Sequence, residues 1–436
     1  MLNAVYTSLL DVLGRDEQSR VEVMRRRWEA YYGKLSPTLK VRVGQIDDNV
    51  RINYARMIVD KGVSFLFGHD VSFEIDEVEE TDAEHWLDAV WAYNRKMSLL
   101  QNAALVGGVT GHVFIKIVTG GEYPRLVTID PETVTVSLAP DDAQQVLSYQ
   151  ISYVSRDPKT QKPVSIRQVI ERDGVRWRIV DQVGDVERLT WTTVNEAVWP
   201  YEFSPIVDCQ NLPAPGEFWG QSDLEDDVIE IIRSINFIAS NTARIIRFHA
   251  HPKTWGRGFA ARDLRIGVDE TIILPGENAE LRNLEMQSDL ASSLRYLEML
   301  RQSLHEISRV PEVATGNLDR AGSLSGVALQ ILYQPLLEKT NTKRLLYGDM
   351  LTELNRRLLA IGGFGDDLRT ALHWQEMLPQ DPMQERQAAL IDMQLGVSQD
   401  TLLQRLGYDP DLERKKREAT GADLGEQILT AFDRGQ

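Results

Sequence analysis

Cysteine is nearly absent from this 436-residue sequence, which contains only Cys209. One cysteine excludes an intramolecular disulfide framework and any zinc site built from several cysteines. No stretch approaches the roughly 20 consecutive apolar residues that a membrane-spanning helix needs. The start of the chain lacks the basic segment and the small-residue cleavage site of a signal peptide. We therefore expect a protein that is assembled in the cytoplasm and has no membrane partner.

Positive charge is in deficit, with 48 Lys and Arg against 65 Asp and Glu, a formal net charge of -17. Proteins that bind nucleic acid tightly usually carry a basic stripe, and no long one is visible here. Short basic clusters at 25–27 and 414–417 stand in helical patterns beside acids, so we interpret them as solvated helix faces. The charge disfavours a high-affinity DNA binder but is compatible with a surface along which DNA moves without sticking.

Catalytic motifs are also missing. The sequence has no GxxxxGK[ST] phosphate loop. His249 and His251 form a pair with no obvious third ligand nearby, which favours a structural role. The acidic run 225–227 stands at an expected helix start, where the helix dipole favours anions, and so needs no metal to explain it. The sequence thus predicts no catalytic residue, no metal site and no cofactor.

The first half of the chain predicts helices and then a sheet. Hydrophobic residues make up 42% and charged residues 26%, which is ordinary for a folded protein with several cores. Apolar periodicity predicts helices over 4–34, 47–68 and 80–105, with a strand at 71–76. Short β-rich runs separated by polar turns then predict hairpin-connected strands at 112–118, 124–129, 133–138, 146–154, 163–170, 174–180 and 187–193. The fold class is therefore α+β, an antiparallel or mixed sheet with helices packed on it.

The second half predicts unusually long helices. One begins after Ser222, a plausible N-cap, and continues to about residue 250. A second runs from about 288 to 308, and a Pro/Gly-rich unit with two short β-like runs separates the two. The pair predicts a hairpin-like projection tipped by a knob. A loop is expected at 309–325, followed by a third long helix over 325–359 that is interrupted at Pro335. A strand at 369–378 and a helical tail at 380–436 follow.

Six segments of the chain, taken in order, resemble the portal proteins of tailed bacteriophages, in the branch typical of long-tailed siphophages. They are RRRWEAYYGKL (25–35), NYARMIVDKGVSFLFGHDVSFEI (53–75), GHVFIKI (111–117), GQSDLEDDVIEIIRSIN (220–236), RVPEVATGNLDRAGSLSGVAL (309–329) and LGVSQDTLLQRLGYDPDLERKKRE (395–418). The resemblance covers nearly the whole chain, with the right helix lengths between the segments.

The resemblance implies a portal-type α+β fold. Its parts would be a mixed α/β wing, two long stem helices bracketing a small β-containing clip, a tunnel loop, a kinked long helix with a strand that returns to the wing, and a helical crown. In this chain they correspond to residues 1–219 for the wing, 220–249 for the first stem helix, 250–285 for the clip, 286–308 for the second stem helix, 309–325 for the tunnel loop, 326–378 for the kinked helix and return strand, and 379–436 for the crown.

The resemblance also implies a function. Portal proteins form a homo-oligomeric ring, typically of twelve subunits, at one vertex of the capsid in the virion. Double-stranded DNA passes non-specifically through the channel during packaging and ejection. The large terminase and later the head-completion or adaptor proteins dock at the clip, and capsid and scaffolding proteins surround the ring. Such a protein is a conduit and not an enzyme.

Two groups of residues become candidate contacts on this interpretation. Along the tunnel loop the candidates facing DNA are Asn317, Asp319, Arg320 and Ser323. In the clip the candidates for partner docking are Lys253, Arg257, Arg262 and Arg265. Arg320 is equally well explained as an exposed or intersubunit-paired arginine, and the clip cations as a source of solubility. The alternative functions are a phage nucleic-acid-processing enzyme and a scaffold whose long helices bind partner helices.

Overall fold

The computed structural model divides the chain into two compact units. The first contains Met1–Ser323 and Ile331–Gln375, and the second contains Leu324–Gln330 and Glu376–Gln436. Helices and antiparallel strands both occur, which confirms the predicted α+β class. The structure describes residues 15–41, 44, 46–75, 82–156, 161, 163–185, 190–250, 254–258, 278–283, 290–315, 326–377, 382–405, 408 and 410–420.

Four helices form the N-terminal part of the first unit. They are α2 (Arg15–Tyr31), α3 (Tyr54–Phe67), α4 (Asp82–Tyr93) and α5 (Lys96–Thr110). The last two turns of α5 are almost entirely buried, because small residues there let neighbouring elements approach closely. Gly107 is the clearest case, since a Cβ at this position would collide with the Tyr347 hydroxyl.

Two helix predictions in this region are wrong in their bounds. The helix expected over 47–68 begins only at Tyr54, where the Asn53 side chain accepts a hydrogen bond from the Arg56 N–H and caps the helix. The expected cap at Asp47 or Asp48 is therefore replaced by an extended segment. The helix expected over 80–105 is split into α4 and α5, because Arg95 between them adopts a left-handed conformation with φ 52°.

Two antiparallel sheets follow α5. One has the strand order β3–β2–β9 and the other the order β4–β5–β6–β7–β8. The strands are β2 (His112–Val118), β3 (Arg125–Ile129), β4 (Val134–Ala139), β5 (Asp142–Arg156), β6 (Pro163–Asp173), β7 (Arg176–Asp185), β8 (Thr190–Trp199) and β9 (Ile206–Gln210), with a 3-10 turn, η1 (Pro131–Thr133), before β4. Seven of them match predicted runs. The sequence did not predict β9, since its five residues include Asp208 and Gln210 and show no clear alternation.

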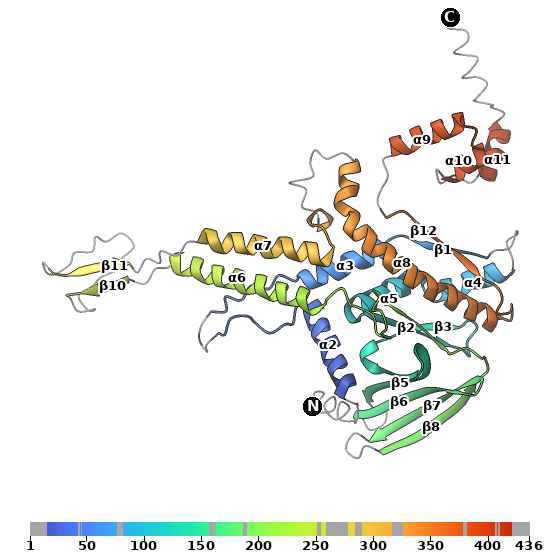
Figure 1. Cartoon of the computed structure of the whole chain (residues 1–436), viewed down its shortest axis with the longest axis horizontal. Helices are drawn as coiled ribbons and strands as arrows, with labels where there is room; N and C mark the ends of the chain where they lie inside the picture. Colours follow the sequence, from blue (N-terminus) through green and yellow to red (C-terminus); the bar gives the residue numbers. More distant parts are fainter. Residues whose placement is uncertain are drawn as a thin grey trace, which may run out of the picture. The chain divides into compact units, whose positions relative to one another are not determined.

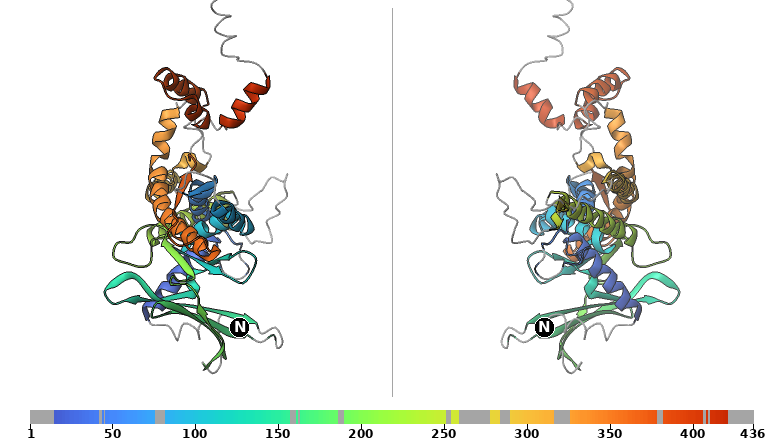
Figure 2. Two further views of the ribbon diagram at one scale, coloured as in Figure 1. Left: turned by 90° about the vertical axis from the view of Figure 1, so that its right-hand side faces the viewer. Right: turned by 90° about the vertical axis from the view of Figure 1, so that its left-hand side faces the viewer.

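The five-stranded sheet packs one face against the main core. Tyr149, Ile151 and Ile170 lie on that face and are buried. Figure 2 shows the long strands of this sheet as a separate layer beside the helices of the same unit. The strand predicted over 369–378 is β12 (Thr370–Trp374), which pairs antiparallel with β1 (Val71–Ile75) in a small sheet of two strands.

Two long helices and most of a third, from Ile331 onward, complete the first unit. Helix α6 (Asp226–Ala250) and helix α7 (Leu290–Ser308) lie side by side (Figure 1). Between them in sequence, β10 (Thr254–Arg257) and β11 (Glu280–Asn283) form an antiparallel hairpin. A short 3-10 turn, η3 (Glu312–Thr315), follows α7, and α8 (Gly326–Gly362) contains Pro335 inside the helix. Since α6 has 25 residues, it is roughly 38 Å long.

Two hydrophobic cores hold these elements together. The larger core includes Leu351, Leu354 and Leu358 of α8, packed with α4, α5 and the strands β1, β2 and β9. The smaller core joins α3 to the start of α6 and the end of α7 through residues such as Ile232 and Leu304. The base of the α6–α7 pair is thus fixed to the rest of the unit.

The second unit contains three short helices. They are α9 (Pro382–Gln394), α10 (Gln399–Arg405) and α11 (Pro410–Thr420). An ion pair of 2.8 Å between Arg414 and Asp400 joins α11 to α10. The tail was predicted to be helical, and most of its described residues are, with a turn after α9. Within the part of the chain that the structure describes, no helix is both long and apolar enough to cross a membrane.

Candidate functional site

The paired helices α6 and α7 form the most distinctive surface of the first unit. Helix α6 packs on its neighbours through Val228, Ile232 and Ile235, and α7 does so through Leu297, Leu300 and Leu304. These positions recur every three or four residues, so each helix uses one apolar face for this contact. Other faces of α6 bind the segments described next.

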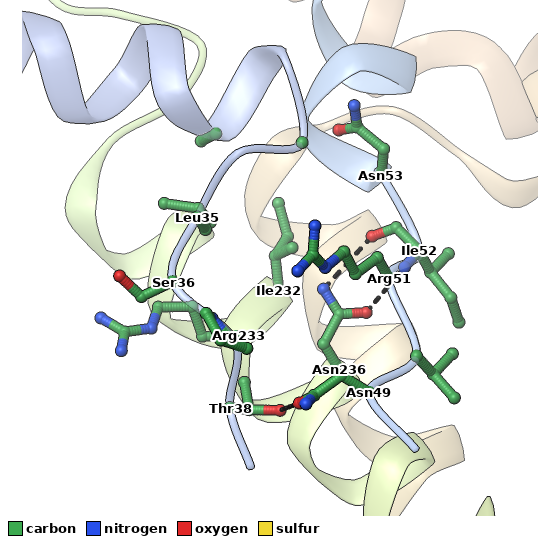
Figure 3. Close-up of a pocket in the computed structure, with 14 residues that line it drawn as sticks. Leu35, Ser36, Thr38, Asn49, Arg51, Ile52, Asn53, Ile232, Arg233 and Asn236 are labelled. Atoms are coloured by element: carbon green, nitrogen blue, oxygen red, sulfur yellow. Dashed lines mark hydrogen bonds between the residues drawn. The ribbon is translucent and has the colours of Figure 1, made fainter. Parts of the chain in front are cut away.

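A second face of α6 binds an extended segment, residues 46–52, which we call the strap. The Ile52 N–H donates to Asn236 Oδ1 at 2.9 Å, and Asn236 Nδ2 donates back to the Ile52 carbonyl at 3.4 Å (Figure 3). One turn further along α6, Ser240 Oγ accepts a hydrogen bond of 2.9 Å from the Val50 N–H. The strap therefore runs antiparallel to α6. Side chains of α6 form hydrogen bonds with backbone groups of the strap that would otherwise pair within a helix over 47–53.

An ion-pair cluster fastens the other end of the strap. The Asp48 Oδ2 atom lies 2.6 Å from Arg247 and 3.4 Å from Arg244, both on α6. Only 7% of the Asp48 side chain is exposed, so the contact is shielded from water. With Asn236 and Ser240, the two arginines form a row at intervals of three or four residues, which is one continuous helix face.

A small pocket of about 40 Å³ lies beneath the strap. Figure 3 shows it between the strap, residues 35–38 and α6, with Arg51 extending over it. Thr38 and Asn49 close one side through a hydrogen bond of 3.5 Å. A pocket of this size holds a water molecule and not a ligand, because small-molecule sites are typically about 300 Å³ or larger.

An exposed apolar stripe marks the outer side of α7. Tyr296, Met299 and Ile307 lie on the flank of α7 beside the Leu297–Leu300–Leu304 contact, and 46%, 53% and 46% of their surfaces are exposed. Large apolar side chains grouped on one helix face commonly mark an interaction surface. We call these three residues the α7 stripe.

A buried charge cluster anchors the base of the helix pair. Asp223, just before α6, lies 2.9 Å from Lys339 Nζ and 2.6 Å from Lys343 Nζ, both on α8. Burial alone raises the pKa of Asp223, but the two ammonium groups more than offset this and lower the pKa to about 2. The carboxylate is therefore ionised throughout the physiological range.

The space for this carboxylate comes from two glycines. A Cβ on Gly62 of α3 or on Gly108 of α5 would lie 3.2 or 3.0 Å from Asp223 Oδ2. Lys339 Nζ also donates to the Ser308 carbonyl at the end of α7, at 3.1 Å. The cluster thus joins α3, α5, α8 and the bases of both paired helices at one point.

The basic residues 25–27 are only partly a solvated face, which corrects the sequence interpretation. Arg27 pairs with Glu225 at 2.8 Å, and its side chain is only 11% exposed. Arg26 pairs with Asp226 at 3.2 Å and with Glu230. The acids at the start of α6 therefore bind α2 in addition to lying in the favourable field of their own helix.

One of the eight predicted contact residues lies in the described part of the chain. Arg257, on β10, forms an ion pair of 2.8 Å with Glu280 on β11, and 72% of its side chain is exposed. Trp255 on the same strand is 42% exposed. The other seven, Lys253, Arg262, Arg265, Asn317, Asp319, Arg320 and Ser323, lie outside the described residues.

The sequence interpretation did not identify the α7 stripe, the strap or the Asp223 cluster. The α7 stripe was readable in principle, as apolar positions that widen the apolar face of the helix beyond what one buried contact needs. The partners of Asp48 and Asp223 were not, since they lie far away in the sequence. Over the residues that the structure describes, no group of three or more His, Cys, Asp or Glu side chains is placed to hold a metal ion.

Comparisons with known proteins give consistent results. Residues 16–423 match the model of a family described as "Phage portal protein, SPP1 Gp6-like". No curated protein matches the chain. Among solved structures, one chain from "Virion of native gene transfer agent (GTA) particle" is 12% identical with a TM-score of 0.52, covering 94% of this chain and 100% of that one. Another, from "Neck of empty GTA particle computed with C6 symmetry", is 13% identical with a TM-score of 0.51, covering 81% and 88%. At these identities the likeness shows a shared fold.

Proposed function

The chain belongs to the SPP1 Gp6-like phage portal family, and from this premise we propose that it forms a ring-shaped channel at one capsid vertex through which double-stranded DNA is packaged and ejected. Family membership makes it a structural virion component and a portal or head–tail connector protein, not an enzyme. The alternative of a nucleic-acid-processing enzyme is therefore excluded. We further propose a homo-oligomer of twelve subunits, assembled in the host cytoplasm.

The main support for the ring proposal is the α7 stripe. Tyr296, Met299 and Ile307 expose apolar surface on a long helix whose adjoining face is already packed. A closed ring needs head-to-tail contacts between copies, and long helices packed side by side supply them. Covering the stripe with the next copy removes the apolar area from water, which favours assembly.

Charge supports the proposed passage of DNA. Each chain carries -17, so a ring of twelve carries roughly -200 before any pKa shift. Like charge facing the phosphates prevents DNA from lodging at fixed positions in the channel. Within the proposed tunnel loop, Asn317, Asp319, Arg320 and Ser323 are the residues that we propose face the duplex.

The β10–β11 hairpin supports a docking role for the proposed clip. Trp255 and Arg257 are exposed on this hairpin, at the end of α6 away from the buried charge cluster. An exposed tryptophan beside an arginine is typical of residues that dominate protein interfaces. We propose that the large terminase and later the head-completion or adaptor protein bind here, with Lys253, Arg262 and Arg265 contributing charge. Capsid and scaffolding proteins would contact the outer surface of the ring.

Purified protein tests the ring directly. We expect negative-stain images to show annular particles with a central hole, and sedimentation to show a large species. Met299→Glu should weaken assembly by roughly tenfold or more, since burying an unpaired carboxylate costs at least about 1.4 kcal/mol per contact.

Val194→Glu is the matched control, because Val194 is 61% exposed on β8, away from the paired helices. A chain that stays monomeric at every concentration and salt level would contradict the ring proposal. It would favour the remaining alternative, a scaffold whose long helices bind partner helices.

A further inference from the structure

We propose that the strap is the surface on which the α7 stripe of the neighbouring copy docks. The proposal rests on the proposed ring and names the two surfaces that meet in it. A ring contact is heterologous, so the patch that each copy presents on one side differs from the patch on its other side. The α7 stripe is one such patch, and a second, different patch must receive it.

The strap replaces α6 itself as the contact surface on one flank of the helix pair. Asn236, Ser240 and Arg247 point toward the strap and are engaged by it. The row that they form runs beside the face that carries Ile232 and Ile235 toward the core. A copy approaching this flank therefore meets the strap before it meets the helix.

The exposed side chains of the strap suit an apolar partner. Ile46 is 70% exposed and Ile52 is 38% exposed, although the backbone between them is fastened to α6. A bound, extended segment that directs isoleucines outward offers apolar surface at little further cost in chain entropy. The α7 stripe, with Tyr296, Met299 and Ile307, is a group of similar character.

The charges beside the two patches are complementary. Arg51 is exposed on the strap, whereas the Asp48 carboxylate is already paired with α6. On α7, Glu306 is exposed and directly precedes Ile307 of the stripe. An arginine on one rim facing a glutamate on the other favours the strap–stripe orientation over a stripe–stripe contact, which would bring two Glu306 side chains together.

Crosslinking between two different chains, each with one added cysteine, tests the contact. An Ile46→Cys chain carrying a size tag is co-expressed with a Met299→Cys chain, and purified rings are treated with a short bis-maleimide. We expect a crosslinked heterodimer, which by construction joins two copies. Burial raises the pKa of Cys209 well above its usual range and slows its reaction, and the unsubstituted chain measures that background.

The matched control pairs the Ile46→Cys chain with a Val194→Cys chain, whose residue is 61% exposed on β8. The proposal predicts at least severalfold more Ile46–Met299 product than Ile46–Val194 product. Rings that form without this excess would overturn the strap contact and leave the proposed function intact. If sedimentation shows no ring, the proposed function fails and the strap contact fails with it.

Discussion

Asp223 is a carboxylate placed where water does not reach it, between two lysines and two glycines. Removing a charge from water is costly, and ion pairs and hydrogen bonds to the charged form offset that cost. The cluster contains two ammonium groups and one carboxylate, so both lysines need this carboxylate to balance their buried charge. Because Asp223 lies at the base of both paired helices, its ion pairs help to fix the orientation of these helices relative to α8.

Asp223→Asn should therefore destabilise the protein by about 3–5 kcal/mol, the usual cost of leaving a buried charge without its partner. Urea unfolding measures the change. Asp226→Asn is the control, since Asp226 is 65% exposed and pairs with Arg26 at the surface, where an ion pair contributes about 1 kcal/mol at most. A loss for Asp223→Asn no larger than for the control would contradict this account.

Wild type and Asp223→Asn together report the pH dependence of this stabilisation. The folded pKa of Asp223 is about 2, below the roughly 3.9 of an unfolded aspartate. A lowered pKa contributes stability that is complete above the unfolded value and is lost as pH falls toward the folded one. The difference between wild type and Asp223→Asn should thus be constant above about pH 5 and shrink between about pH 4 and pH 2.

At the scale of elements, the strap shows how two segments distant in sequence determine each other's structure. Val50 and Ile52 are β-branched and lose little by being extended. Their N–H groups bind Ser240 and Asn236, which satisfies donors that a helix would otherwise have used. The first turn of α3 is capped by Asn53, so the helix starts there without the preceding residues.

Replacing both Asn236 and Ser240 by alanine should loosen the strap. Each lost hydrogen bond removes about 1 kcal/mol, so amide exchange at Val50 and Ile52 should become roughly fivefold faster. Hydrogen exchange read by mass spectrometry measures this directly. Asn241→Ala, on the same helix, is the control and should leave these amides protected. Unchanged exchange in the double variant would show that the strap does not depend on these contacts.

At the scale of the whole molecule, charge opposes assembly. Every copy brings -17 to the proposed ring, and like charges repel over distances that salt shortens. The apolar α7 stripe has to outweigh this repulsion.

Raising ionic strength from about 0.02 M to about 0.3 M should therefore shift the population toward the ring, since the Debye length falls from above 20 Å to below 8 Å. Sedimentation velocity at fixed protein concentration measures the ratio. A shift toward monomer at high salt would mean that ion pairs, and not apolar contact, hold the copies together.

The long elements were predictable from the sequence. The helix expected from about 288 to 308 is Leu290–Ser308, and the one expected over 325–359 is Gly326–Gly362. The strand expected at 112–118 has those bounds in the structure. Helix and strand periodicity is set by neighbours within a few residues, so a local pattern contains the information. The assignments to wing, stem, clip, tunnel loop and crown remain predictions, as do the contacts of the tunnel-loop and clip residues.

What the sequence determined by itself was the order and kind of most elements, the acidic charge and the family that they indicate. Only the tertiary structure decided that residues 46–52 are extended and that Asp223 meets two lysines of α8, 120 positions away in the case of Lys343. It also decided that Arg26 binds the start of α6. Each of these outcomes depends on the free energy of burying and pairing polar groups that meet only after folding, and no local pattern records which distant partner will be there.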